Sequence, residues 1–410
     1  VTLRHRAFRF RVYPTDEQAQ MLAQTFGCVR VVYNQALRHR TDSWFERQER
    51  VSYAASSARL TELKKTDEFV WLNDVSSVPL QQSLRHLQTG FLNFFAGRTG
   101  YPSFKAKHHH RDSAEYTKSA FRWDQVTQQL TLAKMKTPLP IRFSRHVPAE
   151  PTTITISRDP SGRYHVSMLV ETEVTELDDA PNDAIGIDMG ITTFATLSTG
   201  EKVANPRYHQ ADMDRLARAQ RDLARKQKGS KNRGKAAQRV ARIHARIADR
   251  RRDHHHQLST RLVRENQTIV VEDLNLRGMV KDRHLSRAIS DVGWGQFASM
   301  CEYKSDWYGR DFVKIDRWFP STRRCSNCGH IGPKLDLSIR KWDCVECGAH
   351  HDRDHNASIN IRAAGLAVQA CGDGVRPSRN SGDATLVEAG NFRSDSENPT
   401  DSSVGRSQLV

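Results

Sequence analysis

The order of apolar and polar residues in the first half of the chain predicts a strand, a helical block and a hairpin. Residues 6–14 alternate apolar and basic side chains up to a proline, which is typical of a strand with one charged face. Helical patterns follow to about residue 98, and the first begins with Thr15 and Gln18, the signature of a capping box. Residues 150–175 predict a β-hairpin around a Pro-Ser-Gly turn. We expect the hairpin and the first strand to form a small β-barrel with the helical block as an insertion.

The second half of the chain has a different pattern. The acidic, proline-containing segment 175–184 indicates a domain boundary. Beyond it the order strand, strand, long helix, strand, helix, strand, helix predicts an α/β domain. Residues 372–410 are rich in Ser, Gly, Asn and Asp and nearly lack apolar periodicity, so we expect a disordered tail.

The charge of the chain indicates a polyanionic partner. Its net charge is +16 and its pI is near 9.7, and residues 215–252 carry fifteen Lys and Arg against two acids. The apolar positions of this segment keep helical spacing around the sequence GSKNRG, which predicts a helical hairpin with a basic exterior. Nucleic acid is favoured over a membrane surface, because no run approaches the roughly 18 apolar residues of a spanning helix. We expect a cytoplasmic protein.

A basic loop with interleaved aromatic residues, GYPSFKAKHHHR, follows the helical block at residues 100–111. Such a stretch can stack on bases and neutralise phosphates. A solvated connector between domains explains the same composition equally well. The sequence leaves both interpretations open.

Three acidic positions stand at the ends of predicted elements. Asp188 lies among small residues in the strand AIGIDMGIT, where we expect room for an ion and a phosphate backbone, with a strand-capping Asp as the alternative. In TIVVEDLNL, strand alternation places Glu272 and Asp273 on opposite faces, and Glu272 is preferred because it shares a face with Val270.

The third acid opens the last predicted helix. Asp354 is in helical register with apolar residues that follow it, so it lies on the apolar side of the first turn, whereas Asp352 is the more natural cap. The three acids Asp188, Glu272 and Asp354 form the set that two-metal phosphodiester chemistry requires, with two Mg²⁺ ions about 3.5 to 4 Å apart.

Four of the seven cysteines are paired at metal-ligand spacing. Cys325 and Cys328 are separated from Cys344 and Cys347 by fifteen residues, which fits the C-x₂-C-x₁₅₋₂₀-C-x₂-C pattern of a zinc ribbon. Four thiolates fill a tetrahedral site, so the pattern predicts one structural Zn²⁺. A redox role or chance pairing is the alternative.

These motifs together resemble the TnpB (OrfB) family encoded by insertion sequences. The resemblance rests on GIDMGITTFATLS, VVEDLNLRGMV, ISDVGWGQF, CSNCG, CVECGAHHDRDHNASINI, FRFRVYPTDEQ and CVRVVYNQAL, and spans roughly residues 5 to 370. It implies an RNase H-like (RuvC) nuclease domain with an inserted zinc ribbon, preceded by a barrel with an inserted helical lobe. It also implies kinship with type V CRISPR effectors.

The resemblance divides the chain into seven segments. They are a first barrel part and the start of the helical lobe (1–40), the helical lobe (41–120), a second barrel part (121–180), the first nuclease part with the basic hairpin (181–320), the zinc ribbon (321–350), the final nuclease helix (351–371) and the tail (372–410).

The function that the resemblance implies is RNA-guided DNA cleavage. The partners would be a guide RNA and a target DNA with a short adjacent motif, with base pairing reading most of the sequence. Asp188, Glu272 and Asp354 would be the catalytic triad. A transposase and a DNA-binding accessory or regulatory protein of an insertion sequence are the alternatives.

Overall fold

The computed structural model describes residues 3–107, 112–173, 177–336 and 338–370. Contacts divide the chain into two compact units, which are described separately. Unit 1 comprises Val1–Asp183, Ala204–Thr268 and Lys304–Asp311, and unit 2 comprises Ala184–Val203, Ile269–Tyr303 and Phe312–Val410. The predicted tail and residues 108–111 of the basic loop lie outside the described residues.

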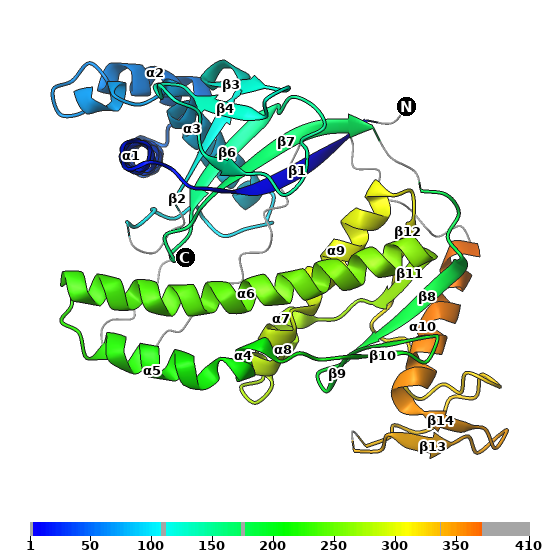
Figure 1. The fold of residues 1–410 in the computed structure, drawn as a ribbon. Helices are drawn as coiled ribbons and strands as arrows, with labels where there is room; N and C mark the ends of the chain where they lie inside the picture. The colour runs from blue at the N-terminus through cyan, green and yellow to red at the C-terminus, as the bar shows by residue number, and fades with distance from the viewer. Residues whose placement is uncertain (1–2, 108–111, 174–176, 337, 371–410) are drawn as a thin grey trace. The chain divides into compact units, whose positions relative to one another are not determined.

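The main sheet of unit 1 has five strands in the order β2-β6-β7-β1-β5 (Figure 1). The predicted hairpin is confirmed, since β6 and β7 pair antiparallel from Thr153↔Leu169 to Arg158↔Tyr164. The first strand, β1, pairs antiparallel with β7 along its whole length. The strands are β1 (Leu3–Val12), β2 (Asp112–Thr117), β5 (Ile141–Arg142), β6 (Thr153–Arg158) and β7 (Tyr164–Glu173).

The expected barrel takes the form of an open sheet in the described part of the chain. β2 and β5 are its two edges, and a separate two-stranded sheet is formed by β3 (Phe121–Asp124) and β4 (Gln129–Leu132). β5 is only two residues long and pairs with β1 alone, so it offers too few backbone groups to close the sheet on itself.

The helical block of unit 1 and the main sheet share one apolar core. Its helices are α1 (Asp16–Arg47), α2 (Tyr53–Leu63) and α3 (Ser77–Phe95), with the 3₁₀ turns η1 (Val70–Asn73) and η2 (Lys118–Ala120). The predicted capping box is confirmed: the Gln18 amide donates to Thr15 Oγ1, and the Thr15 amide donates to Gln18 Oε1. Buried residues of α1 and α3, including Leu22, Leu37 and Leu84, join residues of the sheet in one apolar cluster.

The basic segment forms the predicted helical hairpin. α5 (Met213–Ala224) and α6 (Lys231–Glu265) follow the short α4 (Tyr208–Ala211), and Ser230 caps α6 after a turn in which Gly229 has φ +83°. Leu216, Ala219, Ile243 and Ile247 form the buried stripe between the two helices. By its contacts the hairpin clusters with unit 1.

Unit 2 is built around a second five-stranded sheet in the order β10-β9-β8-β11-β12. β8 and β9 pair antiparallel, with Asp188 opposite Thr196. Along the chain from β8 to α10 the predicted elements occur in the predicted order, with further short strands and helices between them, and the long helix α6 clusters with unit 1. The elements are β8 (Asn182–Met189), β9 (Thr193–Leu197), β10 (Lys202–Ala204), β11 (Asn266–Glu272), α7 (Leu276–Met279), α8 (Ser286–Val292), α9 (Trp294–Trp307), β12 (Asp311–Ile315), β13 (Lys341–Asp343), β14 (His350–Asp352) and α10 (Arg353–Ala370).

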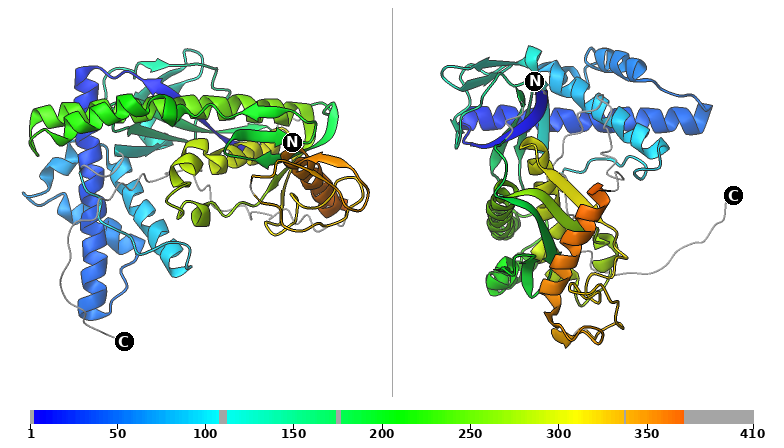
Figure 2. Two further views of the ribbon diagram at one scale, coloured as in Figure 1. Left: turned by 90° about the horizontal axis from the view of Figure 1, so that it is seen from below. Right: turned by 90° about the vertical axis from the view of Figure 1, so that its right-hand side faces the viewer.

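Two glycines allow α10 to lie close to the sheet, as Figure 2 shows for the orange helix. A Cβ at Gly186 of β8 would lie 2.1 Å from the Ser358 carbonyl oxygen, and a Cβ at Gly365 of α10 would lie 2.4 Å from Val270 Cγ1. α10 therefore fills the space next to β8 at Gly186. Strand alternation alone does not reveal which element covers a face of the strand.

No helix among the described residues is long and apolar enough to cross a membrane.

Candidate metal centres

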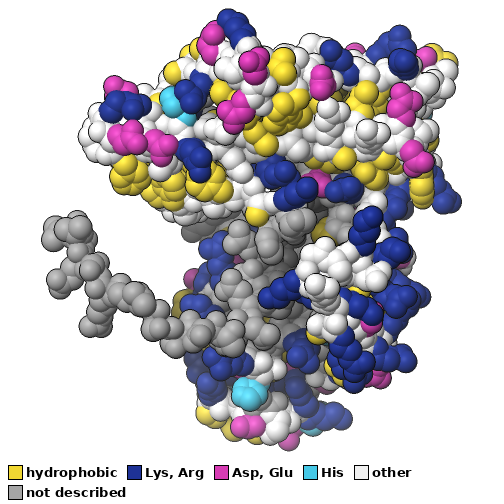
Figure 3. Space-filling view, turned by 90° about the vertical axis from the view of Figure 1, so that its left-hand side faces the viewer, with side chains coloured by type: hydrophobic (Ala, Val, Ile, Leu, Met, Phe, Trp, Pro, Cys, Tyr) yellow, Lys and Arg dark blue, Asp and Glu magenta, His cyan; other side chains and the backbone are white. Residues whose placement is uncertain are grey.

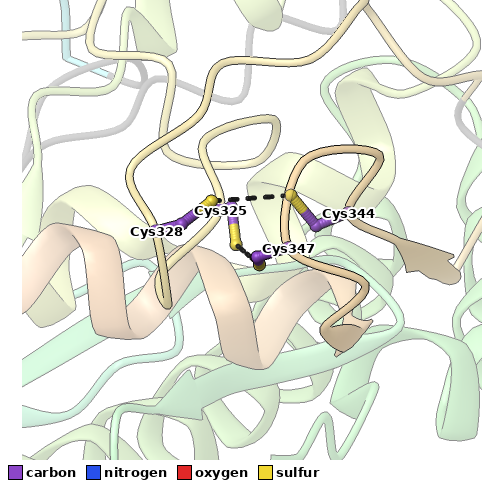
Figure 4. A group of neighbouring side chains, drawn as sticks. All are labelled: Cys325, Cys328, Cys344 and Cys347. Carbon is purple, nitrogen blue, oxygen red and sulfur yellow. Dashed lines mark hydrogen bonds between the residues drawn. The ribbon is translucent and has the colours of Figure 1, made fainter.

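The four cysteines of the two CxxC pairs come together in unit 2 (Figure 4). Their sulfur atoms all lie within 4.8 Å of one another, and the Cys325–Cys347 and Cys328–Cys344 sulfurs are each 3.7 Å apart. Zn–S bonds of about 2.3 Å in a tetrahedron place sulfur atoms about 3.8 Å apart. The cluster therefore fits a zinc ion, and in the described part of the chain it is the one group of three or more metal-binding side chains this close together.

The two CxxC turns have the same backbone design. In the first, the Gly329 amide donates to the Cys325 carbonyl and the Cys325 amide donates to the His330 carbonyl. In the second, Gly348, Cys344 and Ala349 make the equivalent two bonds. Each turn needs a residue with positive φ after its second cysteine, and Gly329 (+81°) and Gly348 (+70°) supply it.

The pKa values of two of the thiols are shifted in opposite directions, since that of Cys328 is raised to about 12 and that of Cys347 is lowered. Hydrogen bonding from the Ala349 amide, followed by that from the Asn327 side chain, lowers the pKa of Cys347 to about 6. His351 Nε2 lies 3.0 Å from Cys325 Sγ, and its ring lies against Trp342 with centroids 4.7 Å apart. His351 was not predicted as part of this site, and its place two residues beyond Ala349 carried no signal for it.

The three predicted catalytic acids lie on three elements of unit 2. Asp188 is at the end of β8, Glu272 is the last residue of the neighbouring strand β11, and Asp354 is in the first turn of α10. All three are partly buried. Their oxygens do not lie as close together as the four sulfurs do.

The carboxylates nevertheless act on one another electrostatically. Burial, followed by the negative charges of Glu272 and Asp354, raises the pKa of Asp188 to about 8. Arg353 and Arg340 oppose this shift without cancelling it. Burial also raises the pKa of Glu272 above its usual range. A group of acids whose charges are so poorly compensated is suited to a bound cation, so the residues fit a divalent metal.

The acids next to the predicted site residues have partners of their own. Asp273 follows the last residue of β11 and forms an ion pair with Arg317. Asp352 Oδ1 accepts a hydrogen bond from the His355 amide, which confirms its predicted role as the cap of α10, and Asp352 also pairs with Lys202. Burial raises the pKa of Asp352, but the bonds from Lys202 and the His355 amide outweigh burial and lower it.

One basic side chain contacts the acid cluster directly. Arg340 Nη1 lies 3.3 Å from Asp354 Oδ1. The Arg340 carbonyl accepts from the Arg353 amide, and the Arg353 guanidinium donates to the carbonyls of Asp336 and Ile339. These bonds hold the segment that precedes β13 against the first turn of α10.

Three polar residues near the acids were missed from the sequence. Ser321 Oγ donates to Glu272 Oε1 over 2.5 Å, and Asn356 and Asn360 hold the backbone near Ser321. Asn356 and Asn360 lie four residues apart on the buried side of α10, between apolar positions. Polar side chains on a buried helix face need hydrogen-bond partners, so the two asparagines could have indicated such a contact from the sequence.

Three family models match separate parts of the chain. Residues 167–283 match the OrfB model described as a probable transposase, residues 294–361 match the Cas12f1-like TNB domain, and residues 4–49 match a helix-turn-helix domain. In the structure the last range forms β1 and the single long helix α1.

Two relatives are similar over nearly their whole length. A protein of Streptomyces pristinaespiralis named "Putative RNA-guided DNA endonuclease" is 60% identical over 92% of this chain and 93% of its own. A protein of Escherichia coli that carries the same name with the suffix InsQ is 32% identical over 92% of this chain and 96% of its own.

The fold is similar to a solved effector structure. The chain in the Cas12f1-sgRNA-target DNA complex aligns with a TM-score of 0.53 at 12% identity, covering 88% of this chain and 98% of that one. At this identity the likeness concerns the fold alone. From the similarity to its two relatives along their length, and from the OrfB match, the chain belongs to the TnpB (OrfB) family.

Proposed function

We propose that this chain is an RNA-guided DNA endonuclease that hydrolyses phosphodiester bonds at Asp188, Glu272 and Asp354. The observation that carries the proposal is the acid cluster itself. Burial, followed by the negative charges of Glu272 and Asp354 from distant parts of the sequence, raises the pKa of Asp188 to about 8. Folding tolerates this repulsion at a cost, which is typical of sites that bind a cation for function.

The three carboxylates would hold divalent ions, and we propose two Mg²⁺. When bound, such ions activate a water molecule and stabilise the leaving oxygen of the phosphodiester. The chain's own contribution is to hold the acids on two neighbouring strands and one helix. Near neutral pH the raised pKa keeps Asp188 largely protonated in the absence of metal, so Asp188 must release this proton before it can ligate.

The division into an RNase H-like nuclease domain with an inserted zinc ribbon is part of the proposal. The second sheet with α10, and the cysteine cluster between β12 and α10, support it. We propose that the ion of the cysteine cluster is Zn²⁺ and that it is structural, because four thiolates leave no open position. The domain boundaries given above from the resemblance remain a prediction.

Guide RNA and target DNA are the proposed partners. The relatives that are 60% and 32% identical carry the name RNA-guided DNA endonuclease, and the net charge of +16 suits binding to nucleic acid. Lys and Arg side chains are numerous on the face drawn in Figure 3.

The proposal is tested by isolating the protein with whatever RNA it binds. The protein is expressed with its native flanking DNA, the copurified RNA is sequenced, and the complex is given one plasmid that matches the RNA and one that does not. We expect Mg²⁺-dependent cutting of the matched plasmid only. Equal cutting of both plasmids, or cutting without RNA, would contradict guidance.

The second candidate function is strand joining, as in a transposase. The family model matched by residues 167–283 carries the description of a probable transposase. The same acid triad can serve transfer of a DNA strand to a new target. Joined products in the plasmid experiment, in place of linear cut products, would favour this function.

A further inference from the structure

The loop from Ser321 to Ser326 contacts both candidate metal centres of unit 2. At its start, Ser321 reaches the carboxylate of Glu272, and near its end Cys325 is one of the four clustered cysteines. Only three residues lie between Ser321 and Cys325 along the chain. A change in the position of this loop would therefore change the geometry of both centres.

Ser321 is bound to Glu272 in a buried setting. The residue is 4% exposed, and its Oγ donates a hydrogen bond to Glu272 Oε1. This bond orients one oxygen of Glu272. It also opposes the effect of burial, which raises the pKa of Glu272.

Two asparagines of α10 hold the backbone of the same loop. Asn360 Nδ2 lies 2.9 Å from the Ser321 carbonyl and 2.6 Å from the Arg324 carbonyl. Asn356 Nδ2 lies 3.4 Å and 2.8 Å from the same two oxygens. Asn356 Oδ1 also accepts from the Ser326 amide over 2.9 Å.

These amides are almost fully buried, at 1% exposed for Asn356 and 4% for Asn360. Buried polar groups that satisfy one another rigidify their surroundings, because breaking one bond leaves its partner without water to replace it. The helix that contributes Asp354 thus also holds the loop that contributes Ser321 and Cys325.

We propose that Ser321 is a positioning residue for Glu272, and that Asn356 and Asn360 lock its loop so that the cysteine and carboxylate centres share one rigid support. The catalytic meaning of this support rests on the proposed function. The linkage itself concerns metal binding and is measurable without DNA cleavage. Side chains that orient metal ligands typically change metal affinity about 10–100-fold when removed.

The first test distinguishes the role of the Ser321 hydroxyl from that of the loop backbone. Ser321→Ala removes only Oγ and keeps the carbonyl that the asparagines bind, Ser321→Thr keeps a hydroxyl, and Ser338→Ala is an exposed control nearby. Binding of Mn²⁺ to the purified full chain with its copurified RNA is followed by electron paramagnetic resonance, and unchanged melting shows that each variant is folded.

We expect Ser321→Ala to weaken Mn²⁺ binding about tenfold and to raise the half-saturating Mg²⁺ concentration for cutting by a similar factor. Ser321→Thr and Ser338→Ala should resemble the wild type. Equal Mn²⁺ affinity in Ser321→Ala and the wild type would overturn the role of the hydroxyl, and so would an equal loss in Ser321→Ala and Ser321→Thr.

The second test addresses the asparagine lock. Asn360→Ala should speed zinc loss to a chelator and also weaken Mn²⁺ binding, whereas Ser321→Ala should change Mn²⁺ binding alone. Unchanged Mn²⁺ affinity in Asn360→Ala would overturn the shared support. If the wild type cuts no DNA with any guide, the proposed function fails, but the Mn²⁺ and zinc measurements still decide the linkage.

Discussion

The cysteine cluster and the acid cluster of unit 2 are built in opposite ways. The four cysteines come from 23 consecutive positions, Cys325 to Cys347, and each pair is shaped by its own turn with a positive-φ glycine. The acids come from residues 188, 272 and 354 and meet only because β8, β11 and α10 pack together.

The two clusters also differ in the surroundings that shift the pKa values of their side chains. The Cys347 sulfur receives hydrogen bonds from the Ala349 amide and the Asn327 side chain, which lower its pKa to about 6. Burial, followed by the charges of Glu272 and Asp354, raises the pKa of Asp188 to about 8. A local site can therefore be prepared by its own backbone, whereas the acid site depends on the rigidity of the whole unit.

The largest expected effect is loss of the cysteine site. Cys344→Ser removes a buried sulfur of the proposed zinc site, and structural zinc binds zinc-finger peptides with an apparent free energy of about 10–16 kcal/mol. We expect zinc in the purified protein, measured by mass spectrometry, to fall to near zero. The control Val345→Ala changes an 83% exposed residue of the same turn and should keep its zinc. Full zinc content in Cys344→Ser would show that Cys344 is not a ligand.

Loss of any acid of the triad should nearly abolish cutting. A catalytic metal contributes several kcal/mol to the transition state, and each 1.4 kcal/mol is tenfold in rate. Asp188→Ala, Glu272→Ala and Asp354→Ala should therefore cut the matched plasmid more than about a hundredfold more slowly, with RNA still bound.

Asp273→Ala is the matched control, because Asp273 adjoins Glu272 but pairs with Arg317. It should cut at close to the wild-type rate. Normal cutting by Glu272→Ala together with loss of cutting in Asp273→Ala would exchange the roles of these two acids.

Substitution of Gly186 tests how closely α10 packs on the sheet. Gly186→Ala places a Cβ 2.1 Å from the Ser358 oxygen, and such overpacking costs about 1–3 kcal/mol of unfolding free energy. Gly234→Ala, in α6 with no atom within 4 Å of the added carbon, should instead gain about 0.5–1 kcal/mol. Urea unfolding compares the two. Equal stability of Gly186→Ala and the wild type would mean that α10 does not lie this close.

The raised pKa of Asp188 predicts a pH-dependent stability of the metal-free protein. Between the ordinary pKa of 3.8 and about 8, the folded state binds more protons than the unfolded state, so stability falls as pH rises. Because each pH unit in this range costs about 1.4 kcal/mol until the folded pKa is reached, we expect a loss of about 3–4 kcal/mol between pH 5 and 8 in chelator. Asp188→Asn should lose less over the same range. A steeper loss in Asp188→Asn would contradict the assigned shift.

The smallest expected effect concerns the cap of α10. Asp352→Ala removes the acceptor of the His355 amide and should cost about 0.5–1 kcal/mol of unfolding free energy. Asp352→Asn keeps a capping oxygen and should cost less. Complete loss of cutting in Asp352→Asn, with stability unchanged, would assign Asp352 a role at the metal site.

Much of the fold could be predicted because its signals are local. The capping box at Thr15, the hairpin at residues 150–175 and the basic helical hairpin each depend on neighbours in the chain, and each is present. Among the described residues the expected barrel is an open sheet, and closure could not be judged from the sequence because it depends on distant edges that no local pattern describes.

The sequence by itself determined the cysteine site, the cap at Asp352 and the identity of the acids that stand at element ends. Spacing and periodicity suffice for these because the interacting atoms are few residues apart. Only the tertiary structure decided that Gly186 receives α10, that Arg340 contacts Asp354 and that Ser321 binds Glu272. These contacts join residues far apart in the chain, and their energies depend on burial and on neighbouring charge, which exist only once the sheet and α10 have packed.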